Sequence, residues 1–176
     1  MTDKNKIIID TYLSPCGELL LGSYEGKLCL CDWNVPDRRD KTYKRIMAWL
    51  DAEYMQGLSE VLQLAKGMLD EYFARQRRTF DIPLLFVGSD FQKHVWEVLQ
   101  GIPYGSCRSY SDLAASIGNP KAVRAVAAAN GANAISIIVP CHRVIGTDGS
   151  LTGYAGGLQA KQFLLNLETG NKHLAL

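Results

Sequence analysis

Apolar and polar positions alternate along the first 33 residues in short runs, which is the pattern of strands in a sheet. Turn-forming residues separate the runs: Ser-Pro-Cys-Gly at 14–17, and Glu25-Gly26, which favours a tight hairpin turn. The strands that we predict span 6–13, 18–23 and 27–33. We therefore expect a small antiparallel sheet at the start of the chain.

The pattern changes to a helical period in the middle of the chain. Residues 34–57 are charged and irregular, with a short helix predicted over 42–50. From residue 58 to about 76, apolar residues recur every three or four positions, as on one face of an amphipathic helix. We interpret residues 77–83 as a connecting strand followed by a linker. A domain boundary near 80–90 follows, with domains over 1–84 and 85–176.

Capping signals divide the second domain into short helices. The Ser-Asp pair at 89–90 is suited to start an apolar-periodic helix, which Gly101 would end. Ser109 and Asp112 have the spacing of a capping box, and the helix that they start is predicted to reach Ile117.

A turn and a second short helix are predicted to follow. Gly118 would end the first helix, Asn119 would cap the second, and Pro120 would occupy its first position, where the missing N–H costs nothing. This alanine-rich helix is predicted over about 120–130, and the spacing is that of a helix-turn-helix. The fold class that we predict is α+β: a small N-terminal antiparallel β-sheet plus helix domain, followed by a mostly helical C-terminal domain with a helix-turn-helix.

Composition fits an ordinary globular chain. With 176 residues, 47% of them hydrophobic and 21% charged, the chain has room for one large or two small domains. It contains no apolar run of about 18 residues, so we expect no membrane contact, and its N-terminus does not resemble a signal peptide. Five cysteines are an odd set, and a reactive thiol among them suits a reducing compartment. We expect a cytoplasmic protein.

The charge distribution is more informative than the net charge of +1. Residues 1–88 carry 12 basic and 13 acidic side chains, whereas residues 106–161 carry five basic and two acidic ones. The basic excess in the second half is modest. It predicts few phosphate contacts and a shallow salt dependence for any nucleic-acid complex.

The most informative string is Val-Pro-Cys-His-Arg-Val-Ile at 139–145. Pro140 is expected to end a strand over 137–139 and to leave Cys141 on a fixed turn. A cysteine nucleophile needs such a mount and a nearby base, because the thiolate is the reacting species. A buried core cysteine is the ordinary alternative, but the polar neighbours His142 and Arg143 argue against it.

The string resembles the active-site motif of the O6-alkylguanine-DNA alkyltransferases, the methylated-DNA–protein-cysteine methyltransferases. Further segments match that family in the same order, and the resemblance is strong over about 88–170 and weak over the first 80 residues. The matching segments are Ser109-Tyr110, Gly118 to Val126, Asn133, Gly153 to Leu158, and Leu164 to Glu168.

The resemblance implies a reaction and a set of catalytic residues. An alkyl group would move from O6 of guanine, or from O4 of thymine, to Cys141 in a single-turnover reaction that needs no cofactor and no metal. His142 would activate the thiol through a water molecule, Glu168 would orient His142, and Asn133 would tie the recognition helix to the thiolate region. From the residues alone, Glu168 remains open to being a surface carboxylate, and Asn133 to being a turn residue.

The resemblance also implies how DNA is bound. A monomer would insert its second helix into the minor groove of double-stranded DNA and rotate the alkylated guanine out of the stack. Arg124 would fill the gap, and Lys121 would contact a phosphate. Ala125 and Ala128 would form a thin surface that allows close approach, although an alanine-rich helix is equally typical of a packed core.

The pocket for the extruded base is assigned in the same way. Tyr110 would contact the DNA backbone and donate a proton toward the guanine, while the 146–157 loop with its five glycines would form the pocket wall. The residues that we expect to bind the substrate are Tyr110, Val144, Tyr154, Ala155 and Gly156.

Two other functions remain open. One is a non-catalytic binder of alkylated lesions, which is disfavoured because such relatives replace the cysteine that this chain keeps as Cys141. The other is a Cys-His-Glu hydrolase unrelated to DNA, which would turn over repeatedly. Cys29 and Cys31 are a poor match to a metal knuckle, so we expect no metal site.

Overall fold

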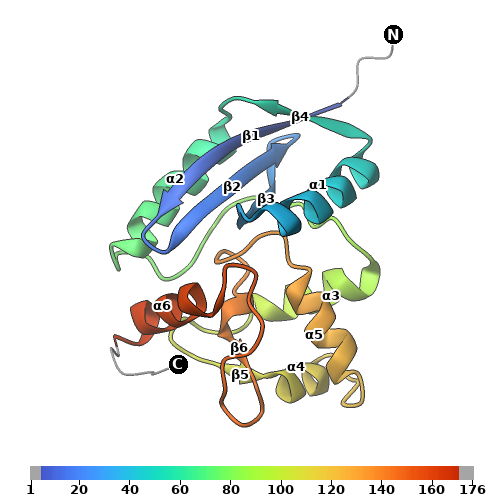
Figure 1. The fold of residues 1–176 in the computed structure, drawn as a ribbon, viewed down its shortest axis with the longest axis vertical. Coiled ribbons are helices and arrows are strands. Elements are labelled where there is room, and N and C mark those ends of the chain that lie inside the picture. The colour runs from blue at the N-terminus through green and yellow to red at the C-terminus, as the bar shows by residue number, and fades with distance from the viewer. Residues whose placement is uncertain (1–4, 171–176) are drawn as a thin grey trace. The chain divides into compact units, whose positions relative to one another are not determined.

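The structure is a computed structural model that describes residues 5–170, and it divides into two compact units, one ending at Gly88 and one starting at Ser89. Each unit is described by itself (Figure 1). No helix within residues 5–170 has the length and apolar character needed to cross a membrane.

The first unit is built on a four-stranded sheet. Strands β1 (Asn5–Ser14), β2 (Gly17–Tyr24) and β3 (Lys27–Trp33) form two antiparallel hairpins, as the alternating pattern predicted. Glu25 and Gly26 both have positive φ, of 48° and 76°, which is the backbone of the tight hairpin turn expected there. A fourth strand, β4 (Ala52–Gln56), pairs with β1 in parallel and completes the order β3-β2-β1-β4.

Two helices accompany this sheet. Helix α1 (Pro36–Leu50) contacts β3 and β4, and α2 (Glu60–Phe73) contacts the three antiparallel strands. The apolar core that the sheet forms with these helices is almost wholly removed from water. It includes Leu19, Leu21, Leu28, Leu30, Leu62, Leu69 and Tyr72, all with relative exposures near zero. At about 25 cal/mol per Å² of apolar surface, such burial is the main stabilising contribution to this unit.

Three predictions for the first unit need correction. The helix predicted over 42–50 begins at Pro36, and β4 lies within the segment that we described as irregular. The connecting strand predicted within 77–83 is absent from the described chain, where only an isolated bridge pairs Leu84 with Leu28.

The second unit is mostly helical. Helix α3 (Asp90–Leu99) and helix α4 (Tyr110–Ser116) both begin with capping boxes, formed by Ser89 with Gln92 and by Ser109 with Asp112. Helix α5 (Val123–Gly131) packs against both of them. The buried indole of Trp96 on α3 donates a 2.8 Å hydrogen bond to the carbonyl of Ala129 on α5. The capping box of Ser109 and Asp112 was predicted from the sequence and is confirmed, and of the two caps that the sequence offered for α3, Ser89 and Asp90, Ser89 is the one found.

Short elements complete this unit. A single turn of 3-10 helix, η1 (Cys141–Arg143), leads into β6 (Val144–Ile145), which pairs in parallel with β5 (Arg108–Ser109). A loop then leads to α6 (Leu158–Thr169). The α+β fold class is confirmed, with the sheet in the first unit and helices dominating the second.

Two predictions for the second unit are wrong in detail. Helix α5 begins at Val123, not at Pro120, because the chain first makes a turn in which the N–H of Ala122 bonds to the carbonyl of Asn119 at 3.0 Å. Lys121 therefore precedes the helix. The strand expected over 137–139 is a buried turn instead, in which Ile137 has a φ of 70°.

Candidate active site

Cys141 lies on a rigid and buried turn. Its own N–H bonds to the carbonyl of Val139 at 2.8 Å, and the N–H of Arg143 bonds to the carbonyl of Pro140 at 3.1 Å. Pro140 fixes the entry to this turn because its ring restricts φ. Cys141 is only 5% exposed, so its thiol is held in one place rather than displayed on a flexible loop.

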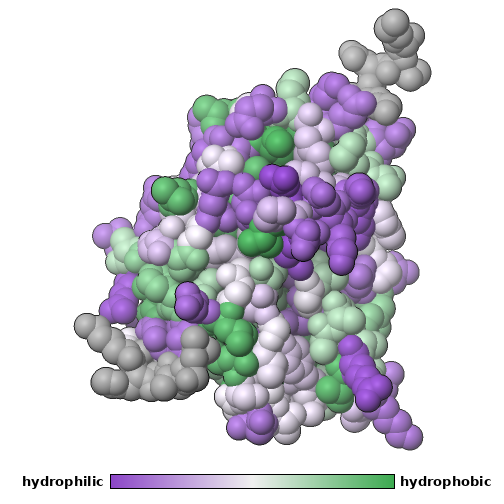
Figure 2. All heavy atoms as spheres, viewed as in Figure 1, coloured by the Kyte–Doolittle hydropathy of each residue, from purple (hydrophilic) through white to green (hydrophobic). Residues whose placement is uncertain are grey.

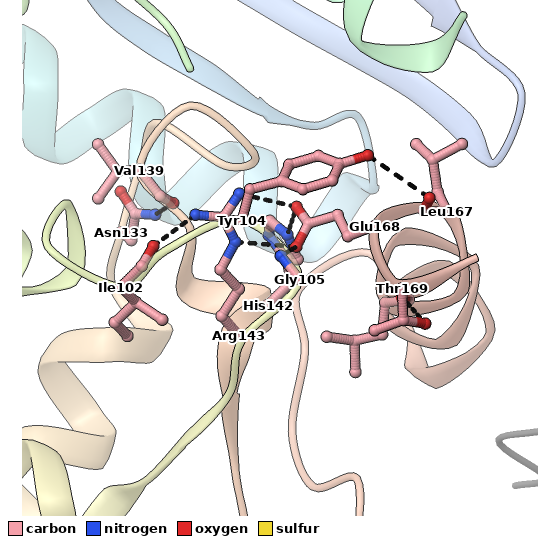
Figure 3. Close-up of polar contacts among 11 residues, drawn as sticks. Ile102, Tyr104, Gly105, Asn133, Val139, His142, Arg143, Leu167, Glu168 and Thr169 are labelled. Carbon is pink, nitrogen blue, oxygen red and sulfur yellow. Dashed lines mark hydrogen bonds and ion pairs between the residues drawn. The ribbon is translucent and has the colours of Figure 1, made fainter. Parts of the chain in front are cut away.

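Asn133 holds the turn that leads to Cys141. Its side-chain oxygen accepts from the N–H of Ile135 at 3.0 Å, and its amide nitrogen donates to the carbonyl of Val139 at 2.9 Å. Figure 3 shows this last contact beside the histidine cluster. Asn133 is 1% exposed and follows the end of α5 by two residues. It therefore links the end of α5 to the backbone just before Pro140.

His142, Arg143 and Glu168 form a buried ionic cluster (Figure 3). The Nε2 atom of His142 lies 2.7 Å from Oε1 of Glu168. The guanidinium of Arg143 donates to both carboxylate oxygens, through Nε to Oε2 and Nη2 to Oε1, each at 2.9 Å. Such a bidentate pair fixes the carboxylate in orientation as well as in charge.

The loop before β5 completes the environment of this carboxylate. Arg143 also donates to the carbonyl of Ile102 at 2.6 Å, its guanidinium lies 5.7 Å from the centre of the Tyr104 ring, and the N–H of Gly105 reaches Oε2 of Glu168 at 3.3 Å. Both carboxylate oxygens of Glu168 thus accept two hydrogen bonds each. The carboxylate is held by groups from two segments of the second unit, η1 and the loop before β5.

These contacts decide the protonation states of Glu168 and His142. Burial by itself would raise the pKa of Glu168, but the hydrogen bonds and charges of His142 and Arg143 outweigh it and hold that pKa well below its usual range. Burial lowers the pKa of His142. We therefore describe His142 as neutral, with its proton on Nε2 and directed to Glu168.

The other ring nitrogen of His142 is then a proton acceptor. Its Nδ1 atom is buried and has no hydrogen-bond partner among the described residues. A neutral imidazole with one nitrogen bound to a carboxylate and the other free to accept is the arrangement of a general base held in one tautomer.

Tyr110 and Asn130 lie near the same cysteine. The hydroxyl of Tyr110 donates to the carbonyl of Thr152 at 3.4 Å, and burial raises the pKa of this phenol, with a smaller contribution in the same direction from the negative charge of Cys141. The amide of Asn130 donates to the carbonyl of Cys141 at 3.5 Å. Asn130 is 4% exposed, and its Oδ1 has no hydrogen-bond partner among residues 5–170.

The remaining substrate residues that we predicted lie in two places. Val144 follows η1 directly and is fully buried, so its side chain is part of the core beside Cys141. Tyr154, Ala155 and Gly156 lie on the loop before α6 and are half-buried. The interactions that fasten this loop include Tyr110 to Thr152, the Ser111 and Thr147 hydroxyls at 3.1 Å, and Asp148 to Ser150.

Helix α5 presents a narrow exposed face. Arg124, Ala125 and Ala128 are exposed, whereas Val126 and Ala129 on the opposite side are buried. Lys121 is exposed too, in the turn before the helix. In Figure 2, much of the surface over α4, α5 and the 146–157 loop is pale, as expected where small residues predominate.

Lys161 was missed in the sequence. It is fully buried, and its Nζ donates to the carbonyls of Val144 at 2.6 Å and Thr152 at 3.0 Å. A signal was available: Lys161 and Glu168 share a helical stripe with Leu164 and Leu165, at positions i, i+3, i+4 and i+7. Two charged residues on an apolar stripe indicate buried charges.

No metal-binding cluster is found in the described part of the chain, where no three His, Cys, Asp or Glu residues are grouped suitably. Cys29 and Cys31 are both buried in the first unit and are not disulfide-bonded.

Family models match both halves of the chain. Residues 7–86 match the 6-O-methylguanine DNA methyltransferase, ribonuclease-like domain, and residues 90–170 match the 6-O-methylguanine DNA methyltransferase, DNA binding domain.

Similar proteins agree with these models. The constitutive methylated-DNA–protein-cysteine methyltransferase of Bacillus subtilis is 45% identical over 156 residues, covering 88% of this chain and 91% of that relative. The Methanosarcina barkeri protein of the same name is 45% identical over 162 residues, covering 92% and 97%.

Solved structures give the same result. The crystal structure of Mycobacterium tuberculosis OGT in complex with DNA has a TM-score of 0.80 and 39% identity, and covers 94% of this chain and 93% of that one. The crystal structure of Mycobacterium tuberculosis O6-methylguanine methyltransferase has a TM-score of 0.78 and 38% identity, with 96% of each chain covered. The chain therefore belongs to the methylated-DNA–protein-cysteine methyltransferases, a family of DNA-binding DNA repair enzymes.

Proposed function

We propose that this protein repairs DNA by moving an alkyl group from O6 of guanine to Sγ of Cys141, in a reaction that each molecule performs once. The observation that carries this proposal is the fixed thiol beside a neutral His142, whose Nε2 lies 2.7 Å from Glu168. A thiol needs a base to react at neutral pH, and this cluster holds one in a single tautomer.

In the proposed reaction, the thiol proton passes through a water molecule to Nδ1 of His142. The sulfur then forms a bond to the alkyl carbon while the bond between that carbon and O6 breaks, leaving its electron pair on the guanine. The guanine takes up a proton from the phenol of Tyr110, and the imidazolium proton returns to that phenol through water. The products are a thioether on Cys141 and an unmodified guanine.

Single turnover follows from the product. Water does not cleave a thioether under these conditions, and no second thiol is assigned to remove the alkyl group. O4-alkylthymine presents the same alkyl–oxygen bond to the sulfur, so we propose it as a second substrate.

The base must leave the duplex to reach a thiol that is 5% exposed. We propose that α4 and α5 act as a helix-turn-helix and that α5 enters the minor groove of double-stranded DNA. The small exposed side chains of Ala125 and Ala128 allow the close approach, and Arg124 fills the gap left in the stack. The minor groove carries a degenerate code, which suits a protein that must act in any sequence.

We also propose a division of labour between two domains, 1–84 and 85–176. Each residue assigned above to chemistry or to DNA lies after Ser89. We assign the transfer reaction to a monomer.

The decisive experiment uses duplex DNA that carries a radiolabelled O6-methylguanine. We expect the label on the peptide that contains Cys141, reaching about one methyl group per chain and then stopping. Cys141→Ser should accept no label, whereas Cys107→Ser, at a half-buried thiol in the same unit, should accept as much as the unmodified protein. Label on another cysteine, or a product that keeps accumulating as a hydrolase would make it, would contradict the proposal.

A further inference from the structure

Lys161 is a buried cation that the reaction described above does not use. It lies on α6, and its side chain is fully removed from solvent. Burying an ammonium group costs several kcal/mol unless hydrogen bonds and opposite charge compensate it. The position of this lysine therefore needs an explanation beyond packing.

Its hydrogen bonds join two segments around Cys141. Nζ donates to the carbonyl of Val144, three residues after the cysteine, and to the carbonyl of Thr152 on the loop before α6. The same Thr152 carbonyl accepts from the phenol of Tyr110. One ammonium group thus fixes the strand that follows the nucleophile and the loop that contacts Tyr110.

Both of these acceptors are neutral, so they leave the charge of Lys161 uncompensated. Glu168, the carboxylate on the same helix, is already paired with Arg143 and bonded to His142. Burial lowers the pKa of Lys161, and negative charge on Cys141 and on Cys107 opposes this effect and favours the ammonium form. The thiolate of the nucleophile is thus one of the two groups whose charge stabilises the buried ammonium.

We propose that Lys161 is a positioning residue for alkyl transfer: it fixes Val144 and Thr152 around Cys141, and its positive charge stabilises the Cys141 thiolate. The inference rests on the proposed function, in which Cys141 is the nucleophile. By reciprocity, a thiolate that favours the ammonium is itself favoured by it.

Other charged and titratable groups belong to the same electrostatic environment and must stay constant in a test. Tyr110 interacts with Cys141, and His142 and Cys107 interact with Lys161. Glu168 and Arg143 act in turn on both His142 and Cys107, and Arg108 acts on Cys107. Substitution of Lys161 alone leaves each of them in place.

Three substitutions separate the two roles of Lys161. Lys161→Arg keeps the charge and the donors, Lys161→Gln keeps a donor without the charge, and Lys161→Met removes both. Gln162→Met is the matched control, because it places the same apolar side chain at the adjacent buried polar position of α6 without changing any charge. Melting temperatures identify any variant that fails to fold.

The reaction to follow is alkylation of Cys141 by iodoacetamide between pH 5.5 and 9.5, quantified by peptide mapping, with methyl transfer from duplex DNA measured in parallel. For Lys161→Gln we expect the midpoint of the pH–rate profile to rise by about one pH unit, which is about tenfold slower reaction at pH 7. The rate should approach that of the unmodified protein at pH 9.5, where the thiol is ionised in both. Lys161→Arg and Gln162→Met should keep the original midpoint.

Lys161→Met should show the same shift and also a lower limiting rate of methyl transfer, because the two carbonyls lose their donor. An unshifted midpoint in Lys161→Gln would overturn the inference, even if Lys161→Met did not fold. Cys16, in the first unit, is the internal reference in each digest. Failure of the proposed function would appear differently, as absence of methyl on Cys141 in the unmodified protein.

Discussion

His142 and Glu168 share a short hydrogen bond, but opposite forces act on their charged states. Burial disfavours a charged imidazole, so His142 is neutral, whereas the guanidinium of Arg143 keeps Glu168 ionised. In the proposed reaction, the carboxylate therefore orients the imidazole beforehand and stabilises the imidazolium that forms.

Glu168→Gln tests this pair. The amide cannot stabilise an imidazolium, so methyl transfer at pH 7 should slow by about 10²-fold, the lower end of what general acid–base catalysis supplies. The apparent pKa of the thiol should rise, and the affinity for unmodified duplex DNA should change little. Single-turnover rates from pH 6 to 9 and a binding titration measure both effects.

The control for this substitution is Glu97→Gln, at an exposed carboxylate on α3 in the same unit. It should leave the rate unchanged. Glu168→Gln also leaves Arg143 buried without its partner, a loss typically worth about 3–5 kcal/mol, so rates are compared only below the melting temperature of the variant. A rate that is unchanged at every pH would show that Glu168 is purely structural.

At the scale of the element, α5 is a short helix whose two faces have different surroundings. Its inner face is fastened to α3 through the Trp96 indole, and Asn133, two residues after its end, ties the chain to the turn before Cys141. Its outer face exposes Arg124 between small side chains. A helix fixed in this way holds Arg124 in a constant relation to Cys141.

Arg124→Ala separates extrusion of the base from the chemistry. Extrusion costs a few kcal/mol, and the variant loses the side chain that we propose fills the vacated stack. Transfer from O6-methylguanine in a duplex should therefore fall by roughly 10- to 100-fold, while reaction with the free O6-methylguanine base should stay close to that of the unmodified protein. Single-turnover assays on both substrates provide the comparison.

Lys121→Ala is the companion variant for α5. Lys121 is exposed in the turn before the helix, and if it contacts a phosphate its loss should weaken duplex binding mildly and evenly across sequences. Equal losses on duplex and on free base after Arg124→Ala would instead indicate that Arg124 supports the fold, and the role in extrusion would have to be abandoned.

Elements with a local chemical signal were predictable from the sequence. The capping boxes at Ser89 and Ser109 and the Glu25-Gly26 turn depend on neighbouring residues only. Strand β4 has no such signal, because its five residues become a strand only by pairing with β1, more than 40 positions away in the chain. Likewise, Pro120 is compatible both with the first turn of a helix and with the turn that is found.

The residues of the candidate site divide in the same way, into those with a signal in the sequence and those whose role depends on the folded chain. Cys141 and His142 stand together in one string, and the family resemblance led to Asn133 and Glu168. Lys161 was missed because a lysine on an amphipathic helix is normally exposed. Its burial depends on two carbonyls, at Val144 and Thr152, that only the folded chain brings together.

For the whole molecule, the two units should respond differently to acid. In the second unit, His142 and Glu168 both have pKa values below their usual ones. The folded state then binds fewer protons than the unfolded state, so stability is lost as pH falls, first below about 6.5 and further below about 4.3. In the first unit, burial raises the pKa of Asp32, so this group adds to stability as the pH falls. The hydrogen bond from Lys66 lowers the pKa of Asp10, which has the opposite effect.

Acid should therefore destabilise the second unit before the first. In the second unit, His142 and Glu168 each change the free energy of unfolding by up to about 1.4 kcal/mol per pH unit in their own pH ranges. In the first unit, the contributions of Asp32 and Asp10 partly cancel. Hydrogen exchange between pH 7.5 and 3.5, corrected for the intrinsic exchange rate and resolved by mass spectrometry, should show protection falling faster in peptides from α6 than in peptides from β2. In Glu168→Gln, the additional loss below about pH 4.3 should disappear, because the group that takes up the proton is gone, and Glu97→Gln should retain it. Parallel loss of protection in α6 and β2 would mean that the charges of the second unit do not control its acid stability.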